Sequence, residues 1–420
     1  MPDRVLVLFP NAWDREQFGH PKYAGRIEFS YFGEDLFSFP GNLKLLTFDA
    51  VGFVDEVCEK FPDIDGVLST DEYVGAILAA AVAERLGLPG NDPGKIITAQ
   101  HKFYSRLTQA EVAPDAVPSA ALVPLRGFTP QTVPEFPFFI KPVKGTFSLF
   151  AAKIESFEEL EQHMGFNVFE RLLLGRITRP FNELLREYTS LERDADFFVA
   201  EGLMRGDQVT VDGFCHGGEV HVMGIVDSVM FPGTNIFERF EYPSRHHPRV
   251  QARMVEATSA LIRGLGITDG QWNVEFFYDR VTDEVKIIEV NPRLSYQFAD
   301  LYEYIDGSNT YDVLLDLSLG HEPGYRRGAG EYRHSASFVM RTFAGGRLQR
   351  VPSSDEVAEF SARYEGSTVK IYGKAGDSTK SELKSVGAYR WAIFNTAANS
   401  MVDLFAINED ALEHLPFETT

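Results

Sequence analysis

The chain reads Gln-Trp-Asn-Val-Glu-Phe-Phe-Tyr-Asp at residues 271–279 and Val-Lys-Ile-Ile-Glu-Val-Asn-Pro-Arg at residues 285–293. Both runs are rich in β-branched and aromatic residues, and the polar stretch between them predicts a β-hairpin. A symmetric loop would place Glu275 opposite Glu289. Because side chains alternate between the two faces of a strand, Glu275, Glu289 and Asn291 would then share one face.

This pairing has a chemical consequence. Two carboxylates directly opposite each other destabilise a sheet unless a positive charge lies between them. A set of oxygen ligands that includes two anions suits Mg²⁺, with nucleotide phosphates completing its shell. The hairpin therefore predicts a metal–nucleotide site. The alternative is a sheet face with two solvated acids, and a register shift of one residue would put the acids on opposite faces.

The composition is that of an ordinary globular protein. The 420 residues are enough for two or three domains with their own cores. Hydrophobic residues make up 44% of the chain and charged residues 24%. Forty basic and 61 acidic residues give a net charge of −21, which argues against nucleic acid or an anionic membrane as the main partner. ATP is not excluded, since a few lysines and a metal ion would bind it.

The two cysteines, Cys58 and Cys215, cannot form a disulfide framework and have no zinc-site spacing. Buried thiols in a reducing compartment are the expected reading. The first residues show no basic segment followed by an apolar run, and no window approaches about 18 uninterrupted apolar residues. We therefore expect a cytoplasmic protein without a membrane span.

The first part of the chain alternates strand and helix signals, which predicts a parallel α/β domain over residues 1–95. The expected strands are residues 4–9, 43–48 and 66–69, with a helix at 53–61. Ser69-Thr70-Asp71-Glu72 is a helix-start signal, and Gly87 ends that helix. Asp71 and Glu72 are either capping acids or residues at the ligand-binding edge of the sheet.

A turn-rich segment at residues 89–94 predicts a boundary, and the glycine-rich segment 324–330 predicts another. Between them we expect α+β structure over residues 96–325, divided at about residue 195, and after them an α+β module over residues 326–420. The expected elements are helices at 95–110, 156–164, 166–189, 249–264 and 355–364, and strands at 136–141, 149–154, 197–204, 208–214, 220–230, 335–343, 369–371 and 390–394.

Lys141 ends an apolar strand and leads into the turn Lys144-Gly145-Thr146-Phe147-Ser148. Gly145 allows close backbone approach, and Thr146 and Ser148 offer hydroxyl and N–H donors, so this turn is suited to phosphate oxygens. The alternative is a hairpin end that carries lysine for solubility. Lys102 is a weaker phosphate candidate, because a lysine on a helix surface is the default.

Glu201 interrupts a nearly continuous apolar run, so its carboxylate needs a donor such as an exocyclic amine or a backbone N–H. Gln208, Thr210 and Asp212 share one strand face, which lines a cleft or faces water. Arg293 follows the acidic hairpin, where a guanidinium holds a substrate carboxylate or an oxyanion, or forms a salt bridge to the neighbouring acids. The basic segment 244–249 is either a solvated loop or a loop over an anionic substrate.

Taken in order, these residues resemble an ATP-grasp enzyme from about residue 66 to residue 293. The pieces that carry the resemblance are Ser69-Thr70-Asp71-Glu72 with residues 86–90, Lys102-Phe103, Lys141-Pro142 with its loop, Glu201 to Asp212, and Glu275 with residues 289–293. In that family two α+β subdomains grip ATP between them. Residues 326–420 look most like the amino-acid ligase branch, although the biotin-carboxylase-like and purine-pathway branches are similar through the core.

The resemblance implies a role for each candidate residue. Phosphates would be bound by Lys102, Lys141 and the turn with Lys144, Thr146 and Ser148, adenine by Glu201 and the backbone near Leu203 and Met204, and ribose by Gln208. One or two Mg²⁺ ions, or Mn²⁺, would be bound by Glu275, Glu289 and Asn291. Lys141 and Arg293 would be catalytic, by neutralising charge on the reacting groups.

Three departures from the family pattern are visible. The phosphate turn has fewer glycines than usual, Gln208 replaces a common glutamate, and Tyr296 follows Asn-Pro-Arg-Leu-Ser where glycine is usual. A bulky ring at position 296 would trim the substrate pocket.

The expected activity is that of an ATP-dependent carboxylate–amine ligase, which forms an amide or peptide bond through an acyl phosphate. The expected substrates are amino acids or a related small carboxylate, and a homodimer is one expected assembly. The alternatives are a bicarbonate-using carboxylase, a purine-pathway-like enzyme and a non-catalytic nucleotide-binding protein.

Overall fold

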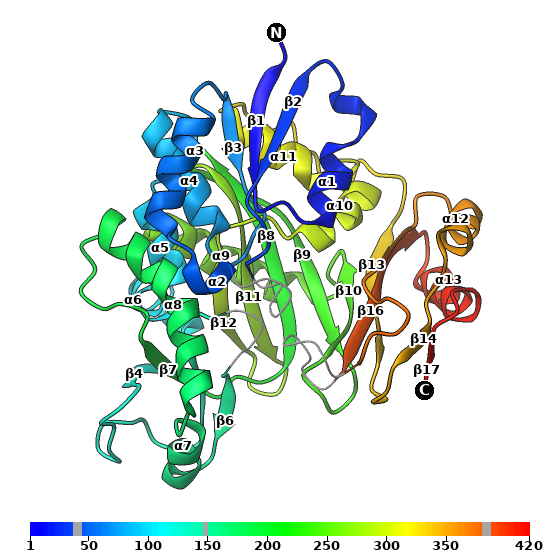
Figure 1. Ribbon diagram of the computed structural model, residues 1–420. Coiled ribbons are helices and arrows are strands. Elements are labelled where there is room, and N and C mark those ends of the chain that lie inside the picture. Colours follow the sequence, from blue (N-terminus) through cyan, green and yellow to red (C-terminus); the bar gives the residue numbers. More distant parts are fainter. Residues whose placement is uncertain (37–43, 146–149, 380–387) are drawn as a thin grey trace.

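The computed structural model describes residues 1–36, 44–145, 150–379 and 388–420. Within these ranges the strands form four sheets, and helices cover them (Figure 1). The mixed α/β architecture with a parallel N-terminal sheet agrees with the expected fold class.

The N-terminal region contains a parallel three-stranded sheet of order β2-β1-β3 in the described residues. Its elements are β1 (Asp3–Leu8), α1 (Ala12–Phe18), η1 (Pro21–Tyr23), β2 (Ile27–Phe32), α2 (Lys44–Thr47), α3 (Ala50–Lys60), β3 (Gly66–Leu68) and α4 (Gly75–Leu86). The strand expected at residues 43–48 is wrong, because residues 44–47 form helix α2. A short apolar run fits a buried helix as well as a strand, and the sheet position is filled by β2.

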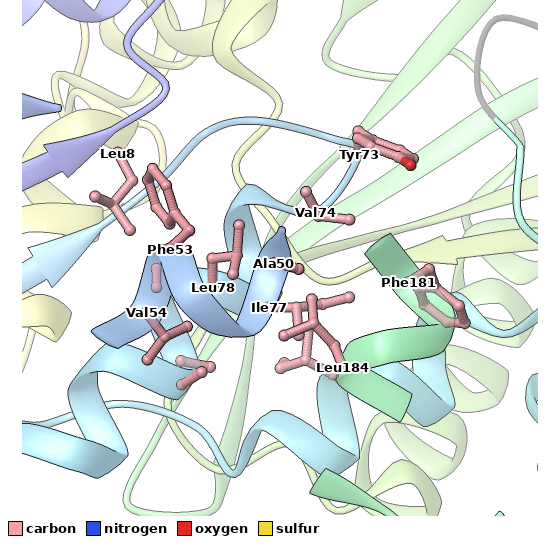
Figure 2. Packing of buried hydrophobic residues seen from close by; sticks show 14 of the residues in the cluster. Leu8, Ala50, Phe53, Val54, Tyr73, Val74, Ile77, Leu78, Phe181 and Leu184 are labelled. Carbon is pink, nitrogen blue, oxygen red and sulfur yellow. The ribbon is translucent and has the colours of Figure 1, made fainter. Parts of the chain in front are cut away.

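The core of this region extends beyond the sheet. Buried side chains of α3 and α4, including Phe53 and Ile77, pack against Phe181 and Leu184 of α8 (Val168–Tyr188) (Figure 2). The N-terminal helices therefore share one apolar cluster with a helix that lies about 100 residues later in the chain, and this cluster fixes the position of the loop that follows β3.

The next region carries an antiparallel four-stranded sheet of order β4-β7-β5-β6 in the described residues. Its elements are α5 (Pro93–Gln100), α6 (Lys102–Val112), η2 (Pro114–Ala116), β4 (Ala120–Pro124), β5 (Phe138–Pro142), β6 (Ala152–Ile154), α7 (Phe157–His163), α8 and β7 (Phe197–Gly202). The single helix expected at 95–110 is two helices. They meet at His101, whose extended backbone ends α5 and whose side chain caps α6.

Of the remaining strands in the described residues, β14 and β17 form a two-stranded sheet and the other eight form one large antiparallel sheet of order β12-β11-β8-β9-β10-β13-β16-β15. Its strands are β8 (Asp207–His216), β9 (Glu219–Met230), β10 (Phe237–Tyr242), β11 (Gly270–Asp279), β12 (Glu284–Asn291), β13 (His334–Thr342), β15 (Thr368–Ile371) and β16 (Tyr389–Ala398). The pairing of β10 with β13 joins the C-terminal strands to the strands that carry the acidic hairpin.

Helices and two short strands complete the second half of the chain. They are α9 (Pro248–Leu265), η3 (Tyr296–Phe298), α10 (Ala299–Asp306), α11 (Thr310–Ser318), β14 (Leu348–Arg350), α12 (Ser354–Arg363), α13 (Met401–His414) and β17 (Glu418–Thr419). In the described residues, we find no helix with the length and apolarity needed to span a membrane.

Candidate active site

Strands β11 and β12 carry the predicted acidic pair. Glu275 lies opposite Glu289 and Asn273 opposite Asn291, as the symmetric hairpin predicts. The loop is nevertheless one residue shorter than expected, because Asp279 pairs with Glu284. A β-bulge at Ile288, which has no partner on β11, restores the register before it reaches the acids.

Arg106 of α6 holds this bulge. Its side chain is 4% exposed and donates from Nη1 to the carbonyl of Ile287 at 2.8 Å and from Nη2 to the carbonyl of Ile288 at 2.6 Å. Its Nε donates to Glu201 at 2.7 Å. The guanidinium group thus binds two consecutive carbonyl oxygens at the bulge, the second of which also accepts from Lys141 Nζ at 3.4 Å. The sequence analysis missed Arg106, because one arginine on a helix carries no signal of its own.

Within the protein, the partners of Glu201 are side chains, and its contact with an exocyclic amine stays a prediction. Besides Arg106, Lys141 of β5 lies 3.0 Å from it. Burial would raise the pKa of Glu201, but Lys141 and Arg106 outweigh burial and hold this pKa below its ordinary value. The carboxylate therefore stays charged, and it fixes the Lys141 ammonium beside the acidic hairpin.

The predicted phosphate-binding lysines differ in their burial and in their partners. Lys102 Nζ is 3.3 Å from Glu289. Lys144 is buried and donates to Gln100 at 2.6 Å, with Tyr73 and Phe181 rings beside its ammonium group. Burial and the nearby Lys102 lower the pKa of Lys144 to about 7. Thr146 and Ser148 lie outside the described residues.

The electrostatics of the acidic pair suit a cation. Burial and the neighbouring Glu289 carboxylate raise the pKa of Glu275. Burial acts on Glu289 in the same direction, but Lys102 and Lys141 hold its pKa below the ordinary value. In the described part of the chain, no three His, Cys, Asp or Glu side chains could hold a metal by themselves. Two carboxylates and one amide oxygen fit Mg²⁺ only if phosphate oxygens complete its shell.

A hydrogen-bond chain sets the direction of the Asn291 amide. Asp212 accepts from Ser295 Oγ at 2.7 Å, and Ser295 Oγ accepts from Asn273 Nδ2 at 2.9 Å. Asn273 Oδ1 in turn accepts from Asn291 Nδ2 at 3.0 Å, and Glu275 Oε1 accepts from the same nitrogen at 3.1 Å. Because a carboxylate can only accept, each link is forced, and the Asn291 nitrogen points into the chain. Its oxygen is left for another partner.

A cavity of about 420 Å³ brings most of the predicted residues together. Its lining includes Lys102, Lys141, Leu203, Met204, Gln208, Glu275 and Glu289. This volume is in the usual range for a small-molecule site. Lys144 and Asn291 line a smaller adjoining cavity with Glu72, Lys102 and Glu289.

Arg293 forms a salt bridge, but not to the acids of the hairpin. Its Nη2 lies 2.8 Å from Glu72 of the N-terminal region. Asp71 is a capping acid, as one reading of the sequence had it, since its side chain accepts from the backbone N–H of Tyr73, Val74 and Gly75. Glu72 instead faces the site, and Arg293 Nε is buried without a hydrogen-bond partner among the described residues.

Comparison with known proteins identifies the domain that carries most of these residues. Residues 134–301 match the family model of the ATP-grasp domain. The chain contains an ATP-grasp domain. The structure of L-amino acid ligase from Bacillus licheniformis is similar over 100% of this chain and 99% of that chain, with a TM-score of 0.72 and 17% identity.

Two further solved structures are similar to nearly the whole chain. Phosphoribosylglycinamide synthetase from Anaerococcus prevotii has a TM-score of 0.66 at 14% identity, covering 100% of both chains. Biotin carboxylase from Campylobacter jejuni has a TM-score of 0.64 at 12% identity, covering 99% of this chain and 92% of that one. Protein y4rH of Sinorhizobium fredii (strain NBRC 101917 / NGR234) is 27% identical over 244 residues, which are 56% of this chain and 44% of that protein.

A second cavity of about 280 Å³ lies beside the first. Arg293 and Tyr296 line it, so Tyr296 does border the space next to the acidic pair. Gln208 lines both cavities, and its Nε2 donates to Glu275 at 2.9 Å. The glutamine that replaces the common glutamate is thus a neutral neighbour of a carboxylate whose pKa is already raised.

The basic segment 244–249 is bound to acids away from the cavities described above. Arg245 pairs with Glu241 at 2.6 Å, and Arg249 pairs with Asp283 at 3.3 Å. Its residues line none of these cavities in the described part of the chain. This favours the reading of a solvated loop.

Proposed function

We propose that the protein is an ATP-dependent ligase that joins a carboxylate to an amine, with amino acids or related small carboxylates as substrates. One observation carries the proposal: Glu72, Gln208, Phe237 and Glu275 line both the larger cavity with its lysines and the second cavity with Arg293. The phosphate end of a nucleotide in the larger cavity would therefore lie next to a small substrate in the second cavity. The likeness of the whole chain to L-amino acid ligase supports this choice of activity.

The nucleotide would be oriented by the chain's own charges. Lys102 and Lys141 would contact its phosphates, and the ion pairs of Glu201 would keep Lys141 in place. Leu203 and Met204 would border the adenine, and Gln208 the ribose side. Thr146 and Ser148 stay predicted phosphate contacts.

A divalent ion, Mg²⁺ or Mn²⁺, held by Glu275, Glu289 and Asn291 would neutralise charge on the phosphates and align them. The neighbouring residues keep these ligands in the state that binds a cation. Lys102 and Lys141 keep Glu289 ionised, and the Asp212 chain keeps the Asn291 oxygen free for a ligand.

The proposed reaction has two steps. A substrate carboxylate oxygen attacks the γ-phosphorus, and the bond from that phosphorus to the ADP oxygen breaks, giving an acyl phosphate. The amine nitrogen then attacks the acyl carbon, the carbon–oxygen bond to phosphate breaks, and the nitrogen loses a proton. Arg293 would stabilise the negative oxygen through its unpartnered Nε, because it borders the second cavity. We assign proton acceptance to Glu72, the acid that pairs with Arg293 and lines both cavities.

The test is release of ADP and phosphate with a panel of carboxylates, with hydroxylamine as a trap for the acyl phosphate and mass spectrometry of the product. Glu289→Gln should abolish turnover and weaken MgATP binding. Glu284→Gln, an exposed position on the same strand, should change neither. Cleavage of ATP only with bicarbonate would indicate a carboxylase, and nucleotide binding that Glu289→Gln leaves unchanged would indicate a non-catalytic binder.

A further inference from the structure

Two arginines of the C-terminal strands border the second cavity. Arg341 on β13 and Arg390 on β16 line it, and strand pairing places them directly opposite each other. Like charges opposite each other destabilise an antiparallel pair. An anion bound beside the Arg390 guanidinium group would offset this repulsion.

The surroundings orient these groups. Arg341 donates to the carbonyl of Phe237 at 3.2 Å and to that of Ala388 at 3.4 Å. Arg390 lies over the Tyr372 ring, 4.3 Å from its centroid. Among the described residues, no carboxylate lies within ion-pair distance of Arg390.

The acids of the cavity belong to its other end. In the part of the chain that the structure describes, its acidic lining residues are Glu72 and Glu275. Glu72 pairs with Arg293, and Glu275 belongs to the acidic pair. The cavity therefore extends across the strands of the sheet, from the predicted metal site on β11 to two cationic side chains on β13 and β16.

We propose that Arg341 and Arg390 hold a substrate carboxylate that does not react. This inference rests on the proposed ligase function, which places the reacting carboxylate at the Arg293 end. Guanidinium groups match a carboxylate with parallel, charge-assisted hydrogen bonds. Phe240, Tyr296 and Phe298 also line the cavity, so the two ends are bridged by an apolar body.

The carboxylate has two chemical sources. It is the second carboxylate of a dicarboxylic acyl donor, or the free carboxylate of an amino acid that acts as the acceptor amine. A cavity of about 280 Å³ limits either substrate to a small molecule.

The two sources are distinguished by assaying Arg390→Gln and Arg390→Lys with pairs of substrates that differ only in the second carboxylate. The donor arm compares glutarate with pentanoate, with hydroxylamine attacking the acyl phosphate to give a hydroxamate and phosphate. The acceptor arm compares glycine with glycinamide. We expect Arg390→Gln to lower kcat/KM by about 10- to 100-fold for the carboxylate-bearing member of one pair only, and Arg390→Lys to lower it less.

Arg363→Gln is the matched control, because Arg363 pairs with Asp410 on the surface of the same module. It should leave every kcat/KM unchanged. Equal effects of Arg390→Gln on both members of both pairs, with ADP still formed, would overturn the inference and leave the ligase proposal intact.

Failure of the ligase proposal gives a different result, namely no ADP from the wild type with any carboxylate. Thermal unfolding then decides the inference by itself. Glutarate or glycine should raise the melting temperature of the wild type but not that of Arg390→Gln, and equal shifts in both proteins, or none, would refute it.

Discussion

Glu275 lies opposite Glu289 because one extra residue, Ile288, bulges out of β12 between the hairpin loop and the acidic pair. Without the bulge, the short loop would place Glu275 opposite Ile288, and Glu289 would move to the other face. Arg106 binds the carbonyl oxygens of Ile287 and Ile288, so one buried guanidinium stabilises the register on which the metal site depends.

The first prediction concerns Arg106→Met. It leaves Glu201 with Lys141 as its single cation and the Ile287 carbonyl oxygen without this donor, while the Ile288 carbonyl oxygen keeps only Lys141 Nζ at 3.4 Å. Breaking a buried ion pair typically costs about 3–5 kcal/mol, so the free energy of unfolding should fall by about that amount. The concentration of Mg²⁺ that gives half-maximal activity should also rise, because Glu289 loses its fixed register. Urea unfolding and Mg²⁺ titration of turnover measure the two effects.

Arg179→Met is the control for this change. Arg179 pairs with Glu183 on the surface of α8, and such exposed pairs contribute about 0.3–0.5 kcal/mol. Its unfolding and Mg²⁺ dependence should match the wild type. An Arg106→Met protein with wild-type Mg²⁺ dependence would show that the bulge holds its register without the arginine.

The acidic pair shows what the sequence could predict and what it could not. Alternation of side chains identified Glu275, Glu289 and Asn291 as one face, and that is local information. The bulge at Ile288 was not predictable, because its stabilising partner lies about 180 residues earlier on α6. The predicted register is right although the predicted loop is one residue too long, since the bulge compensates for the shorter loop.

The second prediction concerns Asp212, which acts on Asn291 as a positioning residue through Ser295 and Asn273. Asp212→Asn introduces a donor, so the chain of hydrogen bonds can reverse, and the Asn291 nitrogen, which donates to Asn273 and Glu275 in the wild type, can turn toward the metal position. Changes of this kind typically lower metal affinity about 10- to 100-fold. Binding of Mn²⁺ in the presence of ADP, followed by electron paramagnetic resonance, should show that loss.

Asp306→Asn provides the matched control. Asp306 is also a buried aspartate that accepts from tyrosine hydroxyls, those of Tyr242 and Tyr325, but it lines none of the cavities described above. Its replacement should leave Mn²⁺ affinity unchanged. Equal losses in both variants would mean that Asp212 contributes to stability alone.

Glu72 shows a different failure of sequence reasoning. Next to Asp71 in a helix-start signal, it is most simply read as a capping acid, and Asp71 does cap α4. The partner of Glu72 is Arg293, about 220 residues away, and no local pattern contains that contact. Strand β10 was missed for another reason, because Phe237–Tyr242 shows no clear alternation of apolar and polar residues.

The third prediction follows from the assignment of Glu72 as proton acceptor. Glu72→Gln should slow amide formation with an amine by about 100-fold or more, which is the usual contribution of a general base. Hydroxamate formation should fall much less, because hydroxylamine is a weaker base that is neutral at pH 7. Parallel assays with both nucleophiles measure the difference, and Glu56→Gln on the exposed face of α3 should affect neither. Equal losses with both nucleophiles would assign Glu72 to the first step.

The fourth prediction concerns His101, which joins α5 to α6, the helix that carries Lys102 and Arg106. His101 is buried, its Nε2 lies 3.2 Å from the carbonyl of Asp194, and its Nδ1 accepts from the N–H of Tyr104 at 3.4 Å. A proton on Nδ1 would face another N–H group. Burial accordingly lowers the pKa of His101 to about 4.

A pKa below that of the unfolded chain means that His101 contributes stability above pH 6.5 and loses it as the pH falls toward about 4. Between pH 6.5 and pH 5 the loss should be about 2 kcal/mol. His101→Asn keeps an N-cap acceptor but does not titrate, so its stability should depend less on pH in this window. Comparing the two proteins is necessary because Asp14 and Asp212, whose pKa values burial raises to about 6, act in the opposite direction. Urea midpoints at both pH values test this, and parallel pH dependences would show that the acid sensitivity of the protein lies elsewhere.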